Sequence, residues 1–134
     1  MARPLVIENT VGDATLRSFM NWNDYENNTE TQSILKHWQK LGRFRANHPA
    51  IGAGVHNMIL ETPYLFTRSF EKGDFKDVVM VGLNYPEGEK TIDVSGVFSN
   101  GAKIRDAYSG VLSEVINDEI SIKSSDSVLL LEQI

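Results

Sequence analysis

The feature that most constrains this fold is one amphipathic helix in front of a tail of short strands. The helix is predicted over 30–47 and carries an apolar stripe at helical spacing, formed by Ile34, Leu35, Trp38 and Leu41. Pro49 disfavours helical backbone at the residue before it, so the helix ends there. A β-sandwich does not by itself need such a stripe. We therefore expect the stripe to pack against something outside the tail.

Two details of the helix carry further expectations. Thr29 and Gln32 fit a capping box, in which the threonine oxygen accepts from an early N–H and the glutamine reaches back. Gly42 lies in the helix interior, where glycine costs about 1 kcal/mol relative to alanine. We expect Gly42 to allow close approach of a neighbour.

After Gly52 the sequence changes to short apolar runs separated by turn signals, of which Asn100-Gly101 is the strongest. Alternation places Ile92 and Ile120 on inward faces. The prediction is a mainly β chain, an antiparallel Greek-key β-sandwich preceded by an irregular segment, 1–28, and one long α-helix. The predicted strands are 56–61, 63–70, 77–85, 89–94, 102–108, 111–117, 119–123 and 127–133.

Composition excludes several classes of function. The 134 residues carry a formal net charge of −5 and no basic stripe, which argues against nucleic acid as a partner. No apolar run approaches the roughly 20 residues of a membrane helix, so no membrane partner is expected. The chain has no cysteine, which excludes disulfides and thiolate chemistry. No cofactor motif is present, since "GAG" at 52–54 lacks the lysine and following helix of a phosphate-binding loop.

Titratable residues give no catalytic or metal site. The carboxyl pairs that could be imagined are Asp74 with Asp77 and Asp106 with Glu114. Asp74 and Asp77 are predicted at a hairpin turn and a strand start, both ordinary solvated positions. Histidine spacing matches no zinc pattern. The prediction is that catalytic and metal residues are absent.

Three stretches carry a family resemblance: "ATLRSFMNW", "ILKHWQKLGRFRANHPAIGAG" and "KTIDVSGVFSNGAKIRDAYSG". In this order they resemble the C-terminal region of an α-amylase-type enzyme of glycoside hydrolase family thirteen. The resemblance implies that 1–50 is a remnant of a catalytic (β/α)₈ barrel, a loop plus the final helix, and that 51–134 is the β-sandwich called domain C. It also implies a start inside a longer enzyme, so Met1 is expected to be a truncated or engineered beginning.

The resemblance also implies roles for residues. The helix stripe, Ile34, Leu35, Trp38 and Leu41, would contact the intramolecular barrel, and Arg17 with Trp22 would border distal sugar subsites in the parent enzyme. The family's catalytic Asp, Glu and Asp motifs have no counterpart here. The fragment is therefore expected to be non-catalytic and to stabilise a barrel that acts on α-1,4-glucans.

Two other classes of function remain open. An independent starch- or maltooligosaccharide-binding module would use exposed aromatic residues, for which the candidates are Trp22, Tyr25, Tyr64, Tyr85 and Tyr108. Tyr85, beside Pro86 at a turn, is expected to be exposed. An interaction domain would instead bind another protein through the helix stripe.

Overall fold

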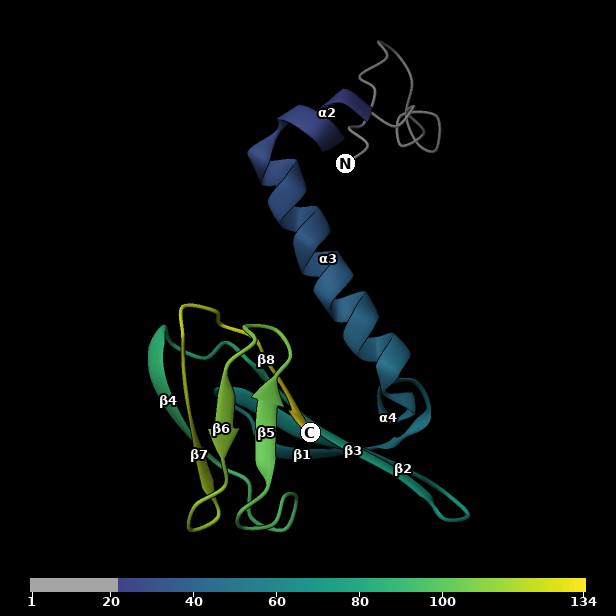
Figure 1. The fold of residues 1–134 in the computed structure, drawn as a ribbon, viewed down its shortest axis with the longest axis vertical. Coiled ribbons are helices and arrows are strands. Elements are labelled where there is room, and N and C mark those ends of the chain that lie inside the picture. Colours follow the sequence, from purple (N-terminus) through teal and green to yellow (C-terminus); the bar gives the residue numbers. More distant parts are fainter. Residues whose placement is uncertain (1–21) are drawn as a thin grey trace. The chain divides into compact units, whose positions relative to one another are not determined.

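The structure is a computed structural model that describes residues 22–134, and the chain divides into two compact units, Met1–Gln39 and Lys40–Ile134. The helices are α2 (Trp22–Asn27), α3 (Thr29–Asn47) and α4 (Pro49–Ala53) (Figure 1). The strands are β1 (Val55–Leu60), β2 (Tyr64–Lys72), β3 (Phe75–Leu83), β4 (Gly88–Asp93), β5 (Lys103–Asp106), β6 (Leu112–Glu114), β7 (Glu119–Ser124) and β8 (Leu129–Gln133).

The long helix is confirmed, but its predicted capping box is wrong. The cap is Asn28, whose side-chain oxygen accepts from the backbone N–H of Thr31 at 3.1 Å. The Gln32 amide donates instead to the backbone oxygen of Glu26, at 2.8 Å. Asparagine satisfies a free N–H at a helix start as well as threonine does, and here it lies one residue earlier.

Directly before the cap, residues 22–27 are helical, whereas the whole segment 1–28 was predicted to be irregular. Helix α2 forms although its residues are mostly polar and none is buried. The amide of Asn27 donates to the side chain of Asn23 at 2.9 Å, one helical turn earlier. Such a pair at i and i+4 supports a helix that sequence propensity alone does not favour.

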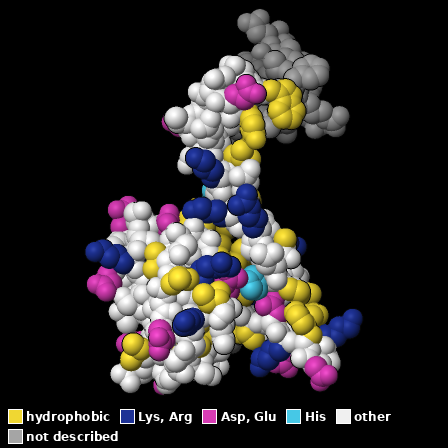
Figure 2. All heavy atoms as spheres, viewed as in Figure 1, with side chains coloured by type: hydrophobic (Ala, Val, Ile, Leu, Met, Phe, Trp, Pro, Cys, Tyr) yellow, Lys and Arg dark blue, Asp and Glu magenta, His cyan; other side chains and the backbone are white. Residues whose placement is uncertain are grey.

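Strand pairing is antiparallel throughout the described residues and forms two sheets. The six-stranded sheet has the order β1-β2-β3-β8-β5-β6, and the second sheet pairs β4 with β7. The pairs β3–β8, β4–β7 and β5–β6 are nested in sequence, so strands that are far apart in the chain meet. The predicted mainly β, sandwich-like fold is confirmed. Charged side chains lie scattered over the visible face of the sandwich (Figure 2).

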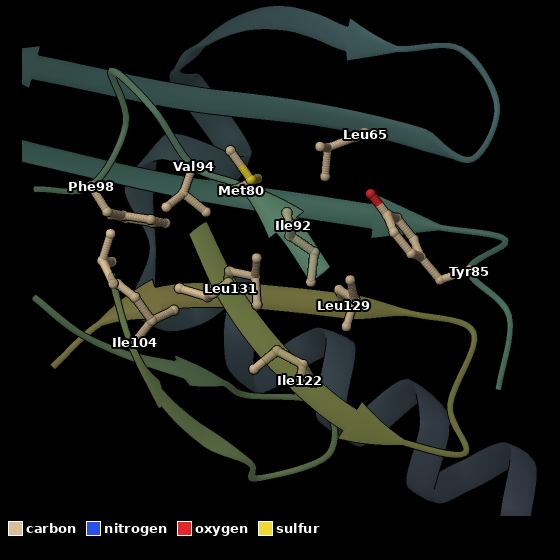
Figure 3. Packing of buried hydrophobic residues seen from close by; sticks show 12 residues of the cluster. Leu65, Met80, Tyr85, Ile92, Val94, Phe98, Ile104, Ile122, Leu129 and Leu131 are labelled. Carbon is tan, nitrogen blue, oxygen red and sulfur yellow. The ribbon is translucent and has the colours of Figure 1, made fainter. Parts of the chain in front are cut away.

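The main core lies between the two sheets (Figure 3). Inward-facing residues of six strands, β2, β3, β4, β5, β7 and β8, supply most of it, including Met80, Ile92 and Ile122, each at most 2 % exposed. Ile92 and Ile120 point inward, as the alternation predicted. Burial of this many branched and unbranched aliphatic side chains is the largest favourable contribution to the fold.

The opposite face of the six-stranded sheet, called here the outer face, carries a second apolar cluster. Val79 and Val81 alternate with Met80 along β3 and therefore point to this side. Phe44 of α3 and Ala50 of α4 cover them. The central strand β3 is thus buried on both faces, which accounts for its almost continuous apolar run.

Helix α4 was not predicted. Pro49 does end α3, because His48 has extended backbone (φ −121°, ψ 97°), but the same proline then occupies the first turn of α4. Proline suits this position because it has no N–H to leave unsatisfied. None of the described helices is both long and apolar enough to cross a membrane.

Two glycines give a matched stability test. A methyl group at Gly54 would lie 2.5 Å from the backbone oxygen of Ala50 and 2.6 Å from that of Ser69, whereas at Gly42 nothing described lies within 4 Å. The expected neighbour of Gly42 is therefore absent from the described residues. We expect Gly54→Ala to lower the free energy of unfolding by about 2 kcal/mol through steric strain, and Gly42→Ala to raise it by up to about 1 kcal/mol. Urea unfolding measures both; equal effects would contradict the packing at Gly54.

Candidate functional site

The residues predicted to border sugar subsites are only partly described. Arg17 lies outside the described residues. Trp22 is the first residue of α2 and is 70 % exposed. An exposed indole can stack on a sugar face, so its role stays a prediction.

The predicted barrel-contact residues all lie on α3. Trp38 and Ile34 are exposed, at 65 % and 38 %, and Leu35 is half-buried. The ring of His37 stands edge-on to that of Trp38, with centroids 5.8 Å apart. Leu41 packs with the outer-face cluster of the sandwich. Their contact with a barrel stays a prediction.

The predicted stripe did not include Phe44, which is the one buried residue of α3. Phe44 is 4 % exposed and packs on the outer face, with its ring 4.6 Å from that of His48. It follows Leu41 by three positions and so shares its side of the helix. This i, i+3 relation was the available signal.

Next to Phe44, a charged network ties the end of α3 to the sheet. His48 lies between two carboxylates, with Nδ1 2.8 Å from Oδ1 of Asp77 on β3 and Nε2 2.5 Å from Oε2 of Glu132 on β8. Arg105 on β5 donates through Nε to Oε1 of Glu132 at 2.7 Å. The side chains of His48, Asp77 and Glu132 are 13 %, 11 % and 8 % exposed. The network therefore joins one helix end to three neighbouring strands.

Asp77 was predicted at a solvated position, and that prediction is wrong. Its second oxygen accepts from the backbone N–H of Ala50 at 2.8 Å, which satisfies a free donor in the first turn of α4. Arg68 binds the other end of α4, donating to the backbone oxygens of Ala50 and Ile51 at 3.1 and 3.2 Å. Sequence reasoning missed these partners because they lie far from α4 along the chain.

This network is suited to fastening rather than to chemistry. Carboxylates only accept hydrogen bonds, so both contacts of His48 are hydrogen bonds only when both ring nitrogens carry protons. Both oxygens of Glu132 and both of Asp77 already have partners. No group of three or more His, Cys, Asp or Glu suited to a metal ion occurs among residues 22–134.

Replacing His48 tests the fastening role. We expect His48→Ala to lower the free energy of unfolding by about 2 kcal/mol, because two largely buried carboxylates lose a partner. His56→Ala is the control, since the bond of His56 to the Tyr64 hydroxyl is exposed. Thermal unfolding followed by circular dichroism gives both values. A loss at His48 no greater than at His56 would show that the network contributes nothing.

Asp106, unlike Asp77 and Glu132, is a fully buried carboxylate, at 0 % exposure. Its oxygens accept from the backbone N–H groups of Tyr108, Ser109 and Leu130 at 3.1, 3.3 and 2.9 Å, and from the Ser109 hydroxyl at 2.5 Å. Asp106 therefore closes the turn after β5 and fastens β8 to it. These hydrogen bonds give the stretch "DAYSG" a structural role, and both oxygens of the Asp106 carboxylate have partners.

The aromatic candidates separate into exposed and buried residues. Tyr64 is half-buried on β2, where its ring stacks with that of His56 at 6.3 Å and its neighbour Phe66 lies 5.3 Å away. Tyr85 was expected to be exposed, but it is 8 % exposed and lies over Gly82, where a side chain would clash with its ring. Burial raises the pKa of the Tyr85 hydroxyl.

Two further candidates differ in their surroundings. Tyr25 of α2 is 45 % exposed. Tyr108 is half-buried under the ammonium group of Lys40, 4.4 Å from its ring centre. Burial, and then the charges of Asp126 and Asp106, raise the pKa of the Tyr108 hydroxyl. The structure therefore brings Tyr64 together with His56 and Phe66, but places Tyr85 in the core.

Comparison with known proteins agrees with the resemblance seen in the sequence. A 65-residue stretch is 45 % identical to the periplasmic alpha-amylase of Escherichia coli (strain K12), covering 48 % of this chain and 9 % of that protein. The fold matches part of an Anoxybacillus alpha-amylase (TM-score 0.51, 21 % identity, 69 % of this chain and 21 % of that one). It also matches part of AmyP, solved with maltose (TM-score 0.54, 19 % identity, 78 % and 21 %).

No protein-family model matches the chain. The chain spans about a tenth of the curated relative and about a fifth of each solved structure. The predicted resemblance to the C-terminal region of an amylase-type enzyme is confirmed by these matches, and the two structures share the fold.

Proposed function

We propose that this chain is a non-catalytic C-terminal domain of an α-amylase-like glycoside hydrolase and that it stabilises the enzyme's catalytic barrel. The barrel, by resemblance, acts on α-1,4-glucans. The observation that carries the proposal is the way α3 ends. Its C-terminal turn is held on the outer face by Phe44 and by the network around His48.

The outer face continues beyond the helix as apolar surface. Phe66 and Leu83 are only half-buried there. On the edge strand β1, Met58 pairs with Phe66 and is 54 % exposed. Every residue of β1 is exposed. A domain that stood alone would leave this apolar surface in water, whereas a barrel seated beside its own last helix would cover it.

The hydrogen bonds of the carboxylates support the proposed non-catalytic character. Retaining hydrolysis of a glycosidic bond needs two carboxyl groups about 5–5.5 Å apart that face the sugar. The two carboxyl pairs considered in the sequence were Asp74 with Asp77 and Asp106 with Glu114. One member of each pair, Asp77 and Asp106, uses both of its oxygens in hydrogen bonds within the fold. Asp74 is exposed at the hairpin between β2 and β3.

An activity assay tests the first half of the proposal. The chain is incubated with maltoheptaose, and new reducing ends are counted against a buffer blank and an active α-amylase. We expect no release above the blank. Release that persists through repeated purification and disappears with Asp77→Asn or Asp106→Asn would overturn the non-catalytic assignment.

The barrel-contact surface is tested through its behaviour in the free chain. Uncovered apolar residues on α3 favour weak self-association, which light scattering detects. We expect Ile34→Gln with Trp38→Gln to reduce association without lowering the unfolding midpoint. The matched control is Ser33→Gln with Gln39→Ala, on exposed positions of the same helix. A large loss of stability in the apolar double variant would show that the stripe is already covered within this chain.

The second candidate function is a starch-binding module. The observation that favours it is the group formed by His56, Tyr64 and Phe66, because sugars bind to exposed aromatic faces with polar groups at the edge. The same group lies on the outer face assigned here to the barrel. Binding to free maltooligosaccharide separates the two functions.

A further inference from the structure

A basic cavity lies beside the C-terminal turns of α3. Its volume is about 270 Å³, and residues of α3, β5 and β8 contribute to its lining. A water molecule takes about 30 Å³ of liquid, so the cavity has room for a small polyatomic ion with its remaining waters. The lining belongs entirely to the unit Lys40–Ile134.

The charges around this cavity are mostly positive. Lys40, Arg43 and Arg105 line it, and the only acid in the lining is Glu132. The carboxylate of Glu132 is already shared between Arg105 and His48. In a chain with a formal net charge of −5, this local excess of positive charge stands out.

The basic groups retain donors for a ligand. Arg105 contacts Glu132 through Nε and Nη2. Because a guanidinium has five N–H donors in a fixed fork, Arg105 keeps further donors for a ligand. Arg43 has no carboxylate within ion-pair distance among the described residues. Lys40 rests over the ring of Tyr108, which orients its ammonium group. Asn47 adds an amide to the same lining.

The supporting elements fix the positions of these donors. Phe44 lies between Lys40 and Asn47 on α3 and is buried against the sheet. Movement of this helix turn away from the cavity would therefore expose the Phe44 ring to water. Arg105 is held on β5 between β6 and β8. Donors from two separate elements therefore face one volume, an arrangement that needs little reordering when an ion enters.

We propose that this cavity binds a phosphate group. Three cations on two elements match a tetrahedral dianion, which offers acceptor oxygens in several directions, better than a planar carboxylate. The charges that act on the Tyr108 hydroxyl come from Asp126 and Asp106, and neither of these carboxylates lines the cavity. This binding goes beyond the proposed function and does not depend on it.

Amide spectra of the full chain test the site with inorganic phosphate as the probe. Phosphate is titrated at constant ionic strength against chloride. Because the site is open to water, we expect saturable shifts with an apparent Kd of about 1 mM, centred on the amides of Asn47, Ala107 and Gly110. Acetate is expected to bind at least about fivefold more weakly, since it has one negative charge. Equal shifts with phosphate, acetate and chloride would overturn the proposal.

A pair of variants on one helix localises the effect. Arg43→Gln is expected to weaken phosphate binding by about fivefold or more, because it removes one of three cations. Arg45→Gln removes the same charge from an exposed residue that does not line the cavity, and it is expected to leave binding unchanged. Equal weakening by both variants would assign the shifts to general electrostatics and contradict the site.

A phosphate ester extends the test to the kind of ligand. Glucose 6-phosphate is titrated with glucose as its control. Shifts at the same amides, absent with glucose, would show that the site accepts the phosphate group of an ester. Equal shifts with glucose would indicate sugar binding and contradict a phosphate site. A failure of phosphate binding would leave the proposed barrel-stabilising role unaffected.

Discussion

Replacing Asp106 by alanine is expected to lower the free energy of unfolding by about 3–5 kcal/mol, one of the two largest effects in the chain. Its carboxylate is fully buried and accepts from three backbone N–H groups and one hydroxyl. Alanine leaves these donors without an acceptor, and each unsatisfied buried donor costs about 1–3 kcal/mol. The N–H of Leu130 is itself buried, so water cannot replace the lost bond there.

Urea unfolding of Asp106→Ala and two companions measures this effect. Asp106→Asn retains one acceptor oxygen and should lose about half as much stability. Asp74→Ala, at the exposed hairpin, should change stability by less than about 0.5 kcal/mol. If Asp106→Ala were as mild as Asp74→Ala, the turn after β5 would not depend on this carboxylate.

Phe44→Ala is expected to lower the free energy of unfolding by about 3 kcal/mol. The phenyl ring is 4 % exposed, and Ala50, Val79, Val81 and Leu130 form the buried cluster around it. Its removal leaves a cavity between α3 and the outer face. It also removes the ring packed 4.6 Å from His48, so the charged network should loosen with it.

The comparison with Trp38→Ala makes this prediction specific. Trp38 is the larger side chain, but it is 65 % exposed in this chain. Its replacement should change the unfolding midpoint little, whereas amide exchange near His48 should accelerate only in Phe44→Ala. Equal destabilisation by both would mean that the whole stripe, and not Phe44 alone, is packed within the chain.

The strands could be predicted from sequence because their signals are local. All eight predicted segments contain a strand, since alternation at Ile92 and Ile120 and turn residues such as Asn100-Gly101 act over a few positions. Helix α2 was missed because a pair of asparagine side chains supports it against its propensity. Helix α4 was missed because its partners, Asp77 and Arg68, come from distant strands.

The candidate site was less predictable than the fold. The stripe on α3 was visible as a periodic pattern, but periodicity does not say which of its residues the chain itself buries. Tyr85 was expected at the surface beside Pro86, but the absence of a side chain at Gly82 makes room for its ring in the core. His48 and Glu132 are 84 positions apart, so their contact requires the folded sheet.

The role proposed for this domain is structural, and a sugar-binding module is the alternative. Titrating maltoheptaose into the chain while recording backbone amide spectra tests it most directly. The structural account predicts no saturable shifts in several millimolar sugar, including at His56, Tyr64 and Phe66. Saturating shifts at sub-millimolar sugar, centred on these residues and abolished by Tyr64→Ala, would contradict it and identify a starch-binding module.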